Sequence, residues 1–579
     1  METITLDTKT TKNKTGKRVS GSDALILSLI AENVKTIFGY PGGAIMPVYD
    51  KLMDYEDQLH HILTRHEQGA IHAAQGFARV SGEVGVCIAT SGPGATNLIT
   101  GIADAFMDST PLVCFTGQVY SHLLGTDAFQ ETDVVGVSMP VTKWNFQVTC
   151  AEEIAPAVAK AFYIARSGRP GPVLIDITKD AMFAEVDFYY EKCTKIRSYI
   201  PIPETKDIRI QQAFELIDNA KRPLALVGQG VVLSGAEKEL KEFIEKTGIP
   251  VASTLLGLSA LPNDHKLYTG MLGMHGNAAP NIKTNEADLI IALGMRFDDR
   301  VTGKVSAYAP NAKKIHFEID KSEVHKIIKV DVTVLGDVKD TLARVTKLVS
   351  PNAHVVWRNS FKFIDDQETS RVIQKELNPE TGQITMGEVL RHLNEVTKGE
   401  AVIVTDVGQH QMVASRYYKF KNKRSFITSG GLGTMGYGLP AAMGAQIAAP
   451  HRKVVSISGD GGFQMTMQEL GTIAFNKVPV KMIVLNNDYL GMVRQWQELF
   501  FDKRYSATSI TSPDFVMLAA SYGIDGQKVT DRKDLHAAVQ KMMDSNEPFI
   551  LEVAVEAKGN VFPMIPSGSA VNEIVFGDE

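Results

Sequence analysis

The sequence is poor in features that would assign it to several large classes of protein. It has only four cysteines, Cys87, Cys114, Cys150 and Cys193, and none has the CxxC spacing typical of a zinc or redox site. Cys87 and Cys114 lie in apolar segments, so we expect buried, reduced thiols rather than disulfides. The net charge of −6 gives no electrostatic reason to expect binding to nucleic acid or to an anionic membrane surface.

Long hydrophobic runs are also missing. No uninterrupted apolar run reaches the roughly 18 residues of a membrane-spanning helix. Residues 1–19 are polar, lack the hydrophobic core of a secretory signal and contain a single arginine, which is unlike a transit peptide. We therefore expect a disordered N-terminal arm at 1–19 on a cytoplasmic protein that has no membrane or nucleic-acid partner.

The chain does contain three successive segments in which short β-rich runs alternate with longer amphipathic ones. This alternation predicts α/β domains, each a doubly wound parallel sheet, and the length suits about three of them. Polar stretches at 187–206 and about 350–380 separate domains at 20–190, 207–350 and 380–579, and the similar outer domains hint at an old duplication. The predicted strands are 84–89, 112–116, 173–177, 224–227, 289–293, 314–319, 401–405, 454–457, 480–485 and 549–555.

The most informative motif lies in the third segment. Gly459-Asp460-Gly461 closes an apolar run and is followed, 24 residues later, by Asn486-Asn487, which closes another. A parallel sheet brings such strand ends together at its carboxyl edge, where open α/β sheets bind ligands. Asp460 and Asn487 could there give oxygen ligands to Mg²⁺, beside a diphosphate at the start of the next helix. The alternative is two unrelated turns, which the spacing and the flanking strands disfavour.

This spacing resembles the thiamine diphosphate (ThDP) motif, GDG followed after some two dozen residues by NN. Enzymes with this motif need a carboxylate beside N1′ of the aminopyrimidine, and Glu67 in RHEQGA is the candidate. Taken alone, Glu67 would more often be a solvated residue at a helix start. The resemblance also implies that Glu67 of one subunit faces Asp460 of another, in a homodimer or homotetramer.

Longer segments narrow the resemblance to one family. GYPGGAIMPVYD, ATSGPGATNLITGIADA, MLGMHG, FDDRVTG, SGGLGTMGYGLPAA and GMVRQWQELF occur in this order. Together they are similar to the catalytic large subunit of acetohydroxyacid synthases, also called acetolactate synthases, from about Ser20 onward. The family joins pyrimidine-binding, central FAD-binding and diphosphate-binding domains. It decarboxylates pyruvate on ThDP and transfers the hydroxyethyl unit to pyruvate or 2-oxobutyrate, giving 2-acetolactate or 2-aceto-2-hydroxybutyrate, in the first common step of branched-chain amino-acid biosynthesis.

The resemblance implies a role for each matching residue. The Mg²⁺ ligands would be Asp460, Asn487 and the carbonyl of Tyr489. The rest of the ThDP site would be Gly408, Gln409, His410, Gly461 and Gly462 around the diphosphate, and Met435 beneath the thiazolium. The catalytic cleft would hold Gly43, Phe129, Gln130 and Lys179, with Arg300 for a substrate carboxylate. FAD would contact Arg169, Thr254, Leu255, Leu256, Met274, His275, Gly276, Gly294, Met295, Arg296, Asp298, Glu318, Ile319 and Asp337.

Several of these assignments have alternatives within the sequence. An isolated Met435 is usually core filler, and Arg300 could pair with Asp298 or Asp299 instead. The middle segment has no GxGxxG fingerprint, so FAD rests on the resemblance, and the Gly-Gln-Gly triplet at 228–230 is weak support. Tyr120 stands where relatives commonly have proline, near the channel mouth, so substrate access and inhibitor sensitivity stay open.

Trp496 in GMVRQWQ favours a biosynthetic over a catabolic acetolactate synthase. Its ring could border the acceptor pocket and favour the extra methyl of 2-oxobutyrate, a contact worth about 1–3 kcal/mol. Catabolic acetolactate synthases lack this tryptophan, so we predict the biosynthetic enzyme. A catabolic acetolactate synthase, a flavin-dependent pyruvate oxidase and an inactive homologue are the alternatives. The family also implies a separate small regulatory subunit, because no segment of this chain resembles an amino-acid-sensing module.

Overall fold

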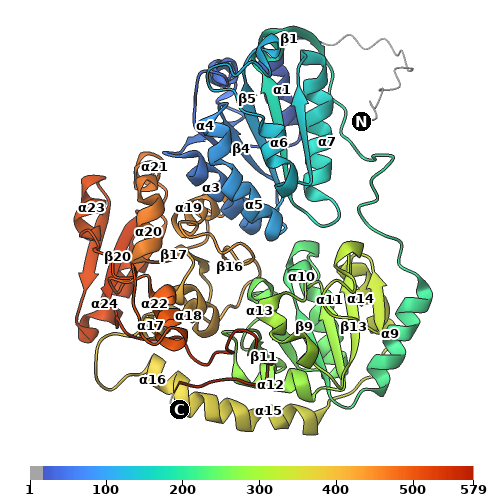
Figure 1. The fold of residues 1–579 in the computed structure, drawn as a ribbon, viewed down its shortest axis with the longest axis vertical. Coiled ribbons are helices and arrows are strands. Elements are labelled where there is room, and N and C mark those ends of the chain that lie inside the picture. Colours follow the sequence, from blue (N-terminus) through green and yellow to red (C-terminus); the bar gives the residue numbers. More distant parts are fainter. Residues whose placement is uncertain (1–16, 578–579) are drawn as a thin grey trace.

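The computed structural model describes residues 17–577, which form three α/β domains (Figure 1). Most of the predicted arm at 1–19 lies outside the described residues. Its last three residues belong to strand β1 (Lys17–Ser20), which pairs antiparallel with β8 (Glu185–Phe188). The backbone hydrogen bonds of this pair make residues 17–19 part of the first domain rather than of an arm, because they tie the start of that domain to its end.

The first domain is built on a parallel sheet with the strand order β3-β2-β4-β5-β7-β6. Its central strands are buried along their whole length, as expected of a sheet covered by helices on both faces. The strands are β2 (Thr36–Gly39), β3 (His60–Leu63), β4 (Gly85–Ala89), β5 (Leu112–Gln118), β6 (Trp144–Val148) and β7 (Pro172–Thr178). The helices are α1 (Gly21–Ala31), α2 (Met46–Leu52), α3 (Glu67–Ser81), α4 (Pro93–Asn97), α5 (Ile99–Met107), α6 (Val134–Ser138), α7 (Ile154–Arg166) and α8 (Lys179–Phe183).

The third domain repeats this topology. Its sheet has the order β16-β15-β17-β18-β20-β19, so that both outer sheets read 2-1-3-4-6-5 when the parallel strands are numbered within each domain. The strands are β15 (Val402–Thr405), β16 (Phe426–Ile427), β17 (Val454–Gly459), β18 (Lys481–Asn486), β19 (Asp525–Val529) and β20 (Phe549–Ala554). The helices are α17 (Met386–Thr397), α18 (Gln409–Tyr417), α19 (Gly438–Ala448), α20 (Asp460–Thr466), α21 (Leu470–Phe475), α22 (Gly491–Phe500), α23 (Phe515–Ser521) and α24 (Arg532–Asp544).

The central domain has a different order, β11-β10-β9-β12-β13-β14, which reads 3-2-1-4-5-6. This is the order of the doubly wound sheets that bind dinucleotides at the point where the chain direction across the sheet reverses. The strands are β9 (Pro223–Val227), β10 (Val251–Ser253), β11 (Tyr268–Met271), β12 (Leu289–Leu293), β13 (Lys313–Glu318) and β14 (Val332–Leu335). The helices are α9 (Asp207–Asn219), α10 (Gln229–Ser234), α11 (Glu237–Thr247), α12 (Ala278–Glu286), α13 (Asp299–Thr302) and α14 (Val338–Leu348).

Two connections join the domains. Between β8 and α9 the described chain has no helix or strand, and it crosses from the first domain to the central one as an extended segment (Figure 1). From the central domain, α15 (Val355–Glu368), a π-helical turn (Thr369–Ile373) and α16 (Gln374–Leu377) lead to the third domain. Every strand predicted from the sequence is present, and three parallel α/β domains are confirmed.

Helices α3 and α19 make the tightest joint between the outer domains. A Cβ added at Gly76 would lie 1.9 Å from the carbonyl oxygen of Ala441, and one added at Gly444 would lie 1.9 Å from that of Ala73. Each helix thus places the same Ala-x-x-Gly pattern against the other. Two backbones can approach this closely only where no Cβ intervenes.

The buried residues form separate clusters on the two faces of the sheets, and one of these clusters includes both α3 and α19. Cys87 and Cys114 are buried free thiols, as predicted. Within residues 17–577 no helix combines the length and the apolar character needed to cross a membrane.

Candidate functional site

Neighbouring strand ends of the third domain bring the GDG and NN motifs together. β17 and β18 pair in register with Gly459 opposite Leu485, so that the next residues, Asp460 and Asn486, lie side by side, and Asn487 follows. On the other side of β17 is β15, which leads into the segment 408–410. β15 and β17 are strands 1 and 3 of this sheet, and the order reverses between them. Ligands of open α/β sheets bind at this kind of switch point.

Asp460 is a buried carboxylate at this edge, with only 1% of its surface exposed. Ser512 Oγ donates a hydrogen bond to its Oδ2 over 3.2 Å. Burial, with a smaller contribution from the negative charge of Asp488, raises the pKa of Asp460 to about 6 against hydrogen bonds that lower it. A cation at this carboxylate would replace the hydration that burial removes.

The turn after β18 fixes the position of Asn487. Its Oδ1 accepts the backbone N–H of Tyr489 at 3.1 Å, and Asp488 between them has a φ of 55°. From the adjacent segment, the Thr508 carbonyl accepts the Leu490 N–H at 2.8 Å. A short turn held from two sides presents the amide of Asn487 and the carbonyl of Tyr489 with little freedom.

The segment after β15 supplies the opposite wall. Gly408 has a φ of 151°, and a Cβ there would lie 2.9 Å from the His410 ring. His410 is buried, its Nε2 has no hydrogen-bond partner among the described residues, and burial lowers its pKa to about 4. Gln409 Nε2 donates to Gln495 Oε1 at 2.9 Å. His410 is therefore a neutral imidazole with one unused nitrogen, which a bound ligand can contact.

Asp406 connects this wall to the loop that carries Met435. Its carboxylate accepts the backbone N–H groups of Gly436 at 3.1 Å and Gly438 at 2.9 Å, on either side of the start of α19. A Cβ at Gly462 would lie 2.3 Å from Asp406 Oδ1, so the GDG turn also packs against this carboxylate. Three predicted ThDP segments therefore meet at Asp406, which the sequence did not single out.

A cavity of about 1010 Å³ opens where the three domains meet. The central domain contributes the residues that follow its strands, the first domain contributes 166–170, and the third contributes Gly408, Met435 and Trp496. The volume is at the upper end of the range for ligand pockets, which suits a ligand of dinucleotide size. The cavity thus runs from the switch point of the central sheet to that of the third domain.

All but one of the residues predicted to hold FAD line this cavity. The exception, Gly276, faces away, and its carbonyl accepts a hydrogen bond from Arg416 Nη1 at 2.7 Å. His275 Nε2 is buried and has no hydrogen-bond partner in the described chain. Burial lowers the pKa of His275 to about 4, with Arg416 and Arg300 adding to the effect. A second neutral imidazole is thus available to a ligand.

A buried ion pair that the sequence analysis missed supports this wall. Arg416 Nη2 lies 2.6 Å from Glu368 Oε1, and both side chains are almost completely buried. Glu368 also accepts the backbone N–H of Ala278 and the side-chain amide of Asn277. Because Arg416 comes from the third domain and Glu368 from α15, the pair fixes the segment 274–278 between two domains. Nothing in the spacing of these residues indicated their pairing.

Arg300 and Trp496, to which the sequence analysis gave contacts with the substrate, both line the cavity. Arg300 Nε lies 3.8 Å from Asp299 Oδ2, and both side chains are more than half exposed, so the ion pair considered for Arg300 is loose. Trp496 lies on α22, with its ring centroid 5.2 Å from that of Phe500. The guanidinium of Arg300 is therefore held only weakly by Asp299. The indole of Trp496 packs against the ring of Phe500.

In the first domain, Glu67 begins α3 and is buried rather than solvated. Asn97 Nδ2 donates to its Oε2 at 3.0 Å, and His66 caps the helix by accepting the Gln68 N–H. A Cβ at Gly94 would lie 3.2 Å from Glu67 Oε1, so the segment after β4 closes over the carboxylate. The reading of Glu67 as a solvated residue at a helix start is excluded for this chain by its 8% exposure.

Glu469 of the third domain holds the loop that leads into Glu67. Its two carboxylate oxygens accept the Arg65 N–H at 3.1 and 3.2 Å, and Thr472 Oγ1 donates to Oε2 at 2.6 Å. Gly69 is the residue against which this carboxylate packs, since a Cβ there would lie 2.2 Å from it. Burial raises the pKa of Glu469 to about 7. The orientation of the Glu67 loop thus depends on the neighbouring domain of the same chain.

The other cleft residues predicted in the first domain lie on its surface. Gly43 is exposed, Phe129 is 88% exposed, and none of Gly43, Phe129, Gln130 and Lys179 lines the cavity. The Lys179 ammonium lies 5.8 Å from the centroid of the Tyr120 ring. Tyr120, which stands where relatives commonly have proline, therefore lies close to Lys179, one of the predicted cleft residues. Within one chain, this set and the cavity are separate.

Asp104 and Asp108 form a second carboxylate contact between the outer domains, which the sequence analysis also missed. Asp108 accepts the backbone N–H groups of Gly430 and Gly431 at 2.8 and 2.7 Å and pairs with Arg79 at 2.7 Å. Asp104 Oδ1 accepts the hydroxyl of Thr434 at 3.1 Å. The available signal was two acidic residues four apart, Asp104 within the largely apolar α5 and Asp108 directly after it.

Comparison with known protein families assigns all three domains. Residues 19–137 match the N-terminal TPP-binding domain of thiamine pyrophosphate enzymes, 210–345 match their central domain, and 406–553 match their C-terminal TPP-binding domain. The matches follow the order of the three sheets, although the first match ends before β6 and β7 and the third begins just after β15. The fold and the domain matches therefore define the chain as a thiamine diphosphate enzyme.

Similar proteins of known name indicate to which family of thiamine diphosphate enzymes the chain belongs. The chain is 45% identical over 558 residues to the acetolactate synthase isozyme 2 large subunit of Escherichia coli, covering 96% of this chain and 99% of that protein. It is 45% identical over 572 residues to the acetolactate synthase large subunit of Corynebacterium glutamicum, covering 97% and 90%. The Lactococcus lactis large subunit is 44% identical, covering 98% of each chain. This chain belongs to the acetolactate synthase large-subunit family.

Proposed function

We propose that this chain decarboxylates pyruvate and transfers the hydroxyethyl unit to a second 2-oxoacid. With pyruvate as acceptor the product is 2-acetolactate, and with 2-oxobutyrate it is 2-aceto-2-hydroxybutyrate, the first common step of branched-chain amino-acid biosynthesis. The observation that carries the proposal is the adjacency of the GDG and NN strand ends in a chain that matches acetolactate synthase large subunits almost from end to end. Bound ThDP would supply the electron sink for decarboxylation.

Mg²⁺ and the diphosphate fit the edge of the third domain. Asp460, Asn487 and the Tyr489 carbonyl would give the cation oxygen ligands, which Mg²⁺ prefers, and diphosphate oxygens would complete its shell. The raised pKa of buried Asp460 supports a cation at this position. The unpartnered His410 Nε2 and the glycines at 408, 461 and 462 would face the diphosphate, and Met435 would support the thiazolium.

FAD fits the large cavity of the central domain. The supporting observations are the 3-2-1-4-5-6 strand order, the 1010 Å³ volume and the unpartnered His275 Nε2. Gly294 and the residues after it would approach the cofactor at the switch point between β9 and β12, and Arg169 would reach it from the first domain. In the reaction proposed here the flavin transfers no net electrons.

The active unit is proposed to be a homodimer, in which Glu67 of one subunit meets Asp460 of the other. The exposure of Phe129 and Gly43 supports this, because a cleft needs a covering surface that one chain does not supply. Glu67 would exchange a proton with the aminopyrimidine N1′, and burial against Gly94 would keep water from it.

Mixing two inactive variants tests this arrangement. When Glu67→Gln and Asp460→Asn chains are co-expressed, half of the dimers are mixed, and each mixed dimer keeps one intact site of two. Activity should then return to about a quarter of the parent value. If every mixture stays inactive although mixed dimers are demonstrated by mass spectrometry, the shared site is excluded.

Product analysis tests the reaction itself. Incubation with pyruvate, ThDP, Mg²⁺ and FAD should give acetolactate and carbon dioxide without consumption of oxygen or quinone. Stoichiometric peroxide formation or quinone reduction would instead support a flavin-dependent pyruvate oxidase and overturn the proposal. If the unmodified protein forms no product with its cofactors bound, it is an inactive homologue.

Trp496 is proposed to select the acceptor. Competition between pyruvate and 2-oxobutyrate should show a preference for 2-oxobutyrate that falls about tenfold in Trp496→Leu, since one methylene contact is worth about 1–3 kcal/mol. Acetolactate formation should persist in the variant. An unchanged ratio of the two products would reject this role and leave the catabolic enzyme as the alternative.

A separate small regulatory subunit is the remaining proposal about partners. It is supported by the names of the relatives, which are large subunits. The cytoplasmic location stays a prediction.

A further inference from the structure

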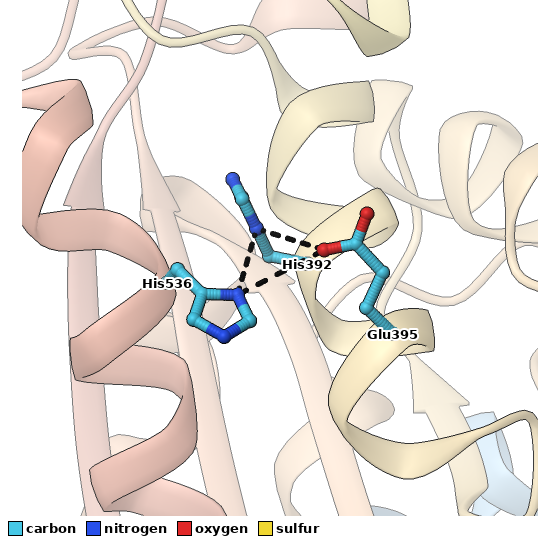
Figure 2. Close-up of side chains that lie close together, drawn as sticks. All are labelled: His392, Glu395 and His536. Atoms are coloured by element: carbon cyan, nitrogen blue, oxygen red, sulfur yellow. Dashed lines mark hydrogen bonds and ion pairs between the residues drawn. The ribbon is translucent and has the colours of Figure 1, made fainter.

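Two helices on the outer side of the third domain bring two imidazoles and a carboxylate together. His392 and Glu395 lie three residues apart on α17, and His536 projects toward them from α24 (Figure 2). None of the three lines the cavity or belongs to the strand ends described above. Among residues 17–577 this is the one group of three or more histidine, cysteine or acidic side chains whose possible ligand atoms converge.

The distances match those expected around a single cation. His392 Nδ1 lies 3.1 Å from His536 Nδ1 and 3.2 Å from Glu395 Oε2, and His536 Nδ1 lies 3.8 Å from the same oxygen. In a tetrahedral site with metal–nitrogen bonds of about 2.0–2.1 Å, neighbouring ligand atoms are about 3.3–3.4 Å apart. The triangle observed here is close to one face of such a tetrahedron.

The ligand types select the class of metal. Two imidazole nitrogens and one carboxylate oxygen suit a borderline divalent cation such as Zn²⁺, whereas Mg²⁺ prefers oxygen ligands alone. His392 is the most protected of the three, with 13% of its side chain exposed, against 45% for Glu395 and 56% for His536. The open side faces solvent, from which an ion and a fourth ligand can enter.

The charges around the group are mixed. Arg391 Nη2 lies 3.0 Å from His392 Nε2, and Arg391 Nη1 pairs with Glu395 Oε1 at 2.8 Å. Because a guanidinium can only donate, the contact of Arg391 with His392 Nε2 selects the neutral tautomer of His392 that carries its proton on Nδ1. In that state Nδ1–H of His392 donates to Glu395 and Arg391 donates to Nε2. A metal on Nδ1 needs the other tautomer, so Arg391 must turn away from Nε2.

We propose that His392, Glu395 and His536 form a three-ligand binding site for a divalent cation of the zinc type, which joins α24 to α17. Water would take the fourth position. Because α17 begins the third domain and α24 immediately precedes its last strand, the ion closes the outer layer of that domain. The cation would stabilise the fold by binding the folded state alone, and it would take no part in turnover.

The test is calorimetric titration of the cofactor-loaded enzyme, kept in Mg²⁺ and freed of other metals, with Zn²⁺. We expect one site per chain with micromolar affinity, a raised melting temperature, and at least a tenfold loss of affinity in both His392→Ala and His536→Ala. His265→Ala is the matched control, since His265 pairs with Glu245 at 3.2 Å without a second imidazole. Binding that is absent, weaker than millimolar, or equal in the histidine variants and the control would overturn the proposal.

Two further measurements separate a built site from casual binding to surface histidines. Arg391→Gln should tighten Zn²⁺ binding, because it removes a positive charge and the donor that opposes the required tautomer. Co²⁺ bound in place of Zn²⁺ should give the intense visible absorption of a tetrahedral complex, and His536→Ala should abolish it. Weaker binding in Arg391→Gln together with an octahedral Co²⁺ spectrum would contradict the site. Acetolactate formation should be unchanged in His536→Ala and in the control.

Discussion

The first and third domains have the same strand order, but different chemistry at the same edge. In the third domain the switch point carries Asp460, the 408–410 turn and several glycines, which suit a cation and a diphosphate. In the first domain the carboxyl edge carries Glu67, buried beneath Asn97 and Gly94. Residues at strand ends thus distinguish two sites on one frame, as is general for folds that host many functions.

The two domains also hold each other in a reciprocal way. Glu469 of the third domain binds the loop before α3, and Asp108 of the first binds the loop before α19. The contacts differ in charge. Glu469 accepts the backbone N–H of Arg65, whereas Asp108 accepts two backbone N–H groups and also pairs with buried Arg79. The two contacts between the domains are therefore similar in geometry but differ in charge. Mutations can test the consequences of this difference.

The largest expected effect is at the two edges themselves. Glu67→Gln should lower kcat for acetolactate formation by about 10²–10⁴-fold while ThDP still binds in the presence of Mg²⁺. Asp460→Asn should lower activity through weaker cofactor binding, with partial recovery at high Mg²⁺, because a cation ligand is lost. Steady-state kinetics and calorimetric titration with ThDP measure both, with exposed Glu83→Gln as control. Equal losses of ThDP affinity in the two variants would contradict the division of roles.

The next largest effect is expected when the buried ion pair between Asp108 and Arg79 is broken. Asp108→Asn should destabilise the enzyme by about 3–5 kcal/mol, because the Arg79 guanidinium then stays buried without its counter-charge. The urea midpoint at fixed cofactor concentration measures this. Asp207→Asn is the control, since its pair with Arg344 is solvent-exposed and should matter little. A similar midpoint for the two variants would show that Asp108 acts only through the glycine loop.

The structure also shows which features could be predicted from the sequence and which could not. The three sheets were predictable because buried parallel strands, such as 289–293, read as continuous apolar runs between helical segments. The meeting of Asp460 and Asn487 was predictable because both follow such runs. The Ala73–Gly444 contact and the Arg416–Glu368 pair were not, since helical periodicity says which face is apolar but not which distant helix will cover it. The group of His392, Glu395 and His536 was hidden for the same reason.

The reciprocal glycines should give a smaller, symmetric effect. Gly76→Ala and Gly444→Ala each place a methyl group against a backbone carbonyl, and forcing the helices apart should cost about 1–3 kcal/mol in either variant. The double variant should lose less than the sum, because one separation of α3 from α19 relieves both clashes. Gly559→Ala, whose nearest neighbour would be 3.6 Å away, is the control for the change of residue. Strict additivity would show that the two contacts are independent.

The last expected effect appears only when the pH is changed, and it concerns Glu469. Burial raises its pKa to about 7 in the folded enzyme, from about 4.5, so folding favours the protonated form. The folded state therefore binds the extra proton, and its stability should fall as the pH rises from about 4.5 to about 7. Glu469→Gln keeps an acceptor for the Arg65 N–H but cannot ionise, so the difference in urea midpoint between variant and parent should shift in favour of the variant across this range. A constant difference from pH 5 to 8 would mean that the carboxylate is ionised throughout, and the contact with the Glu67 loop would then be a charged one.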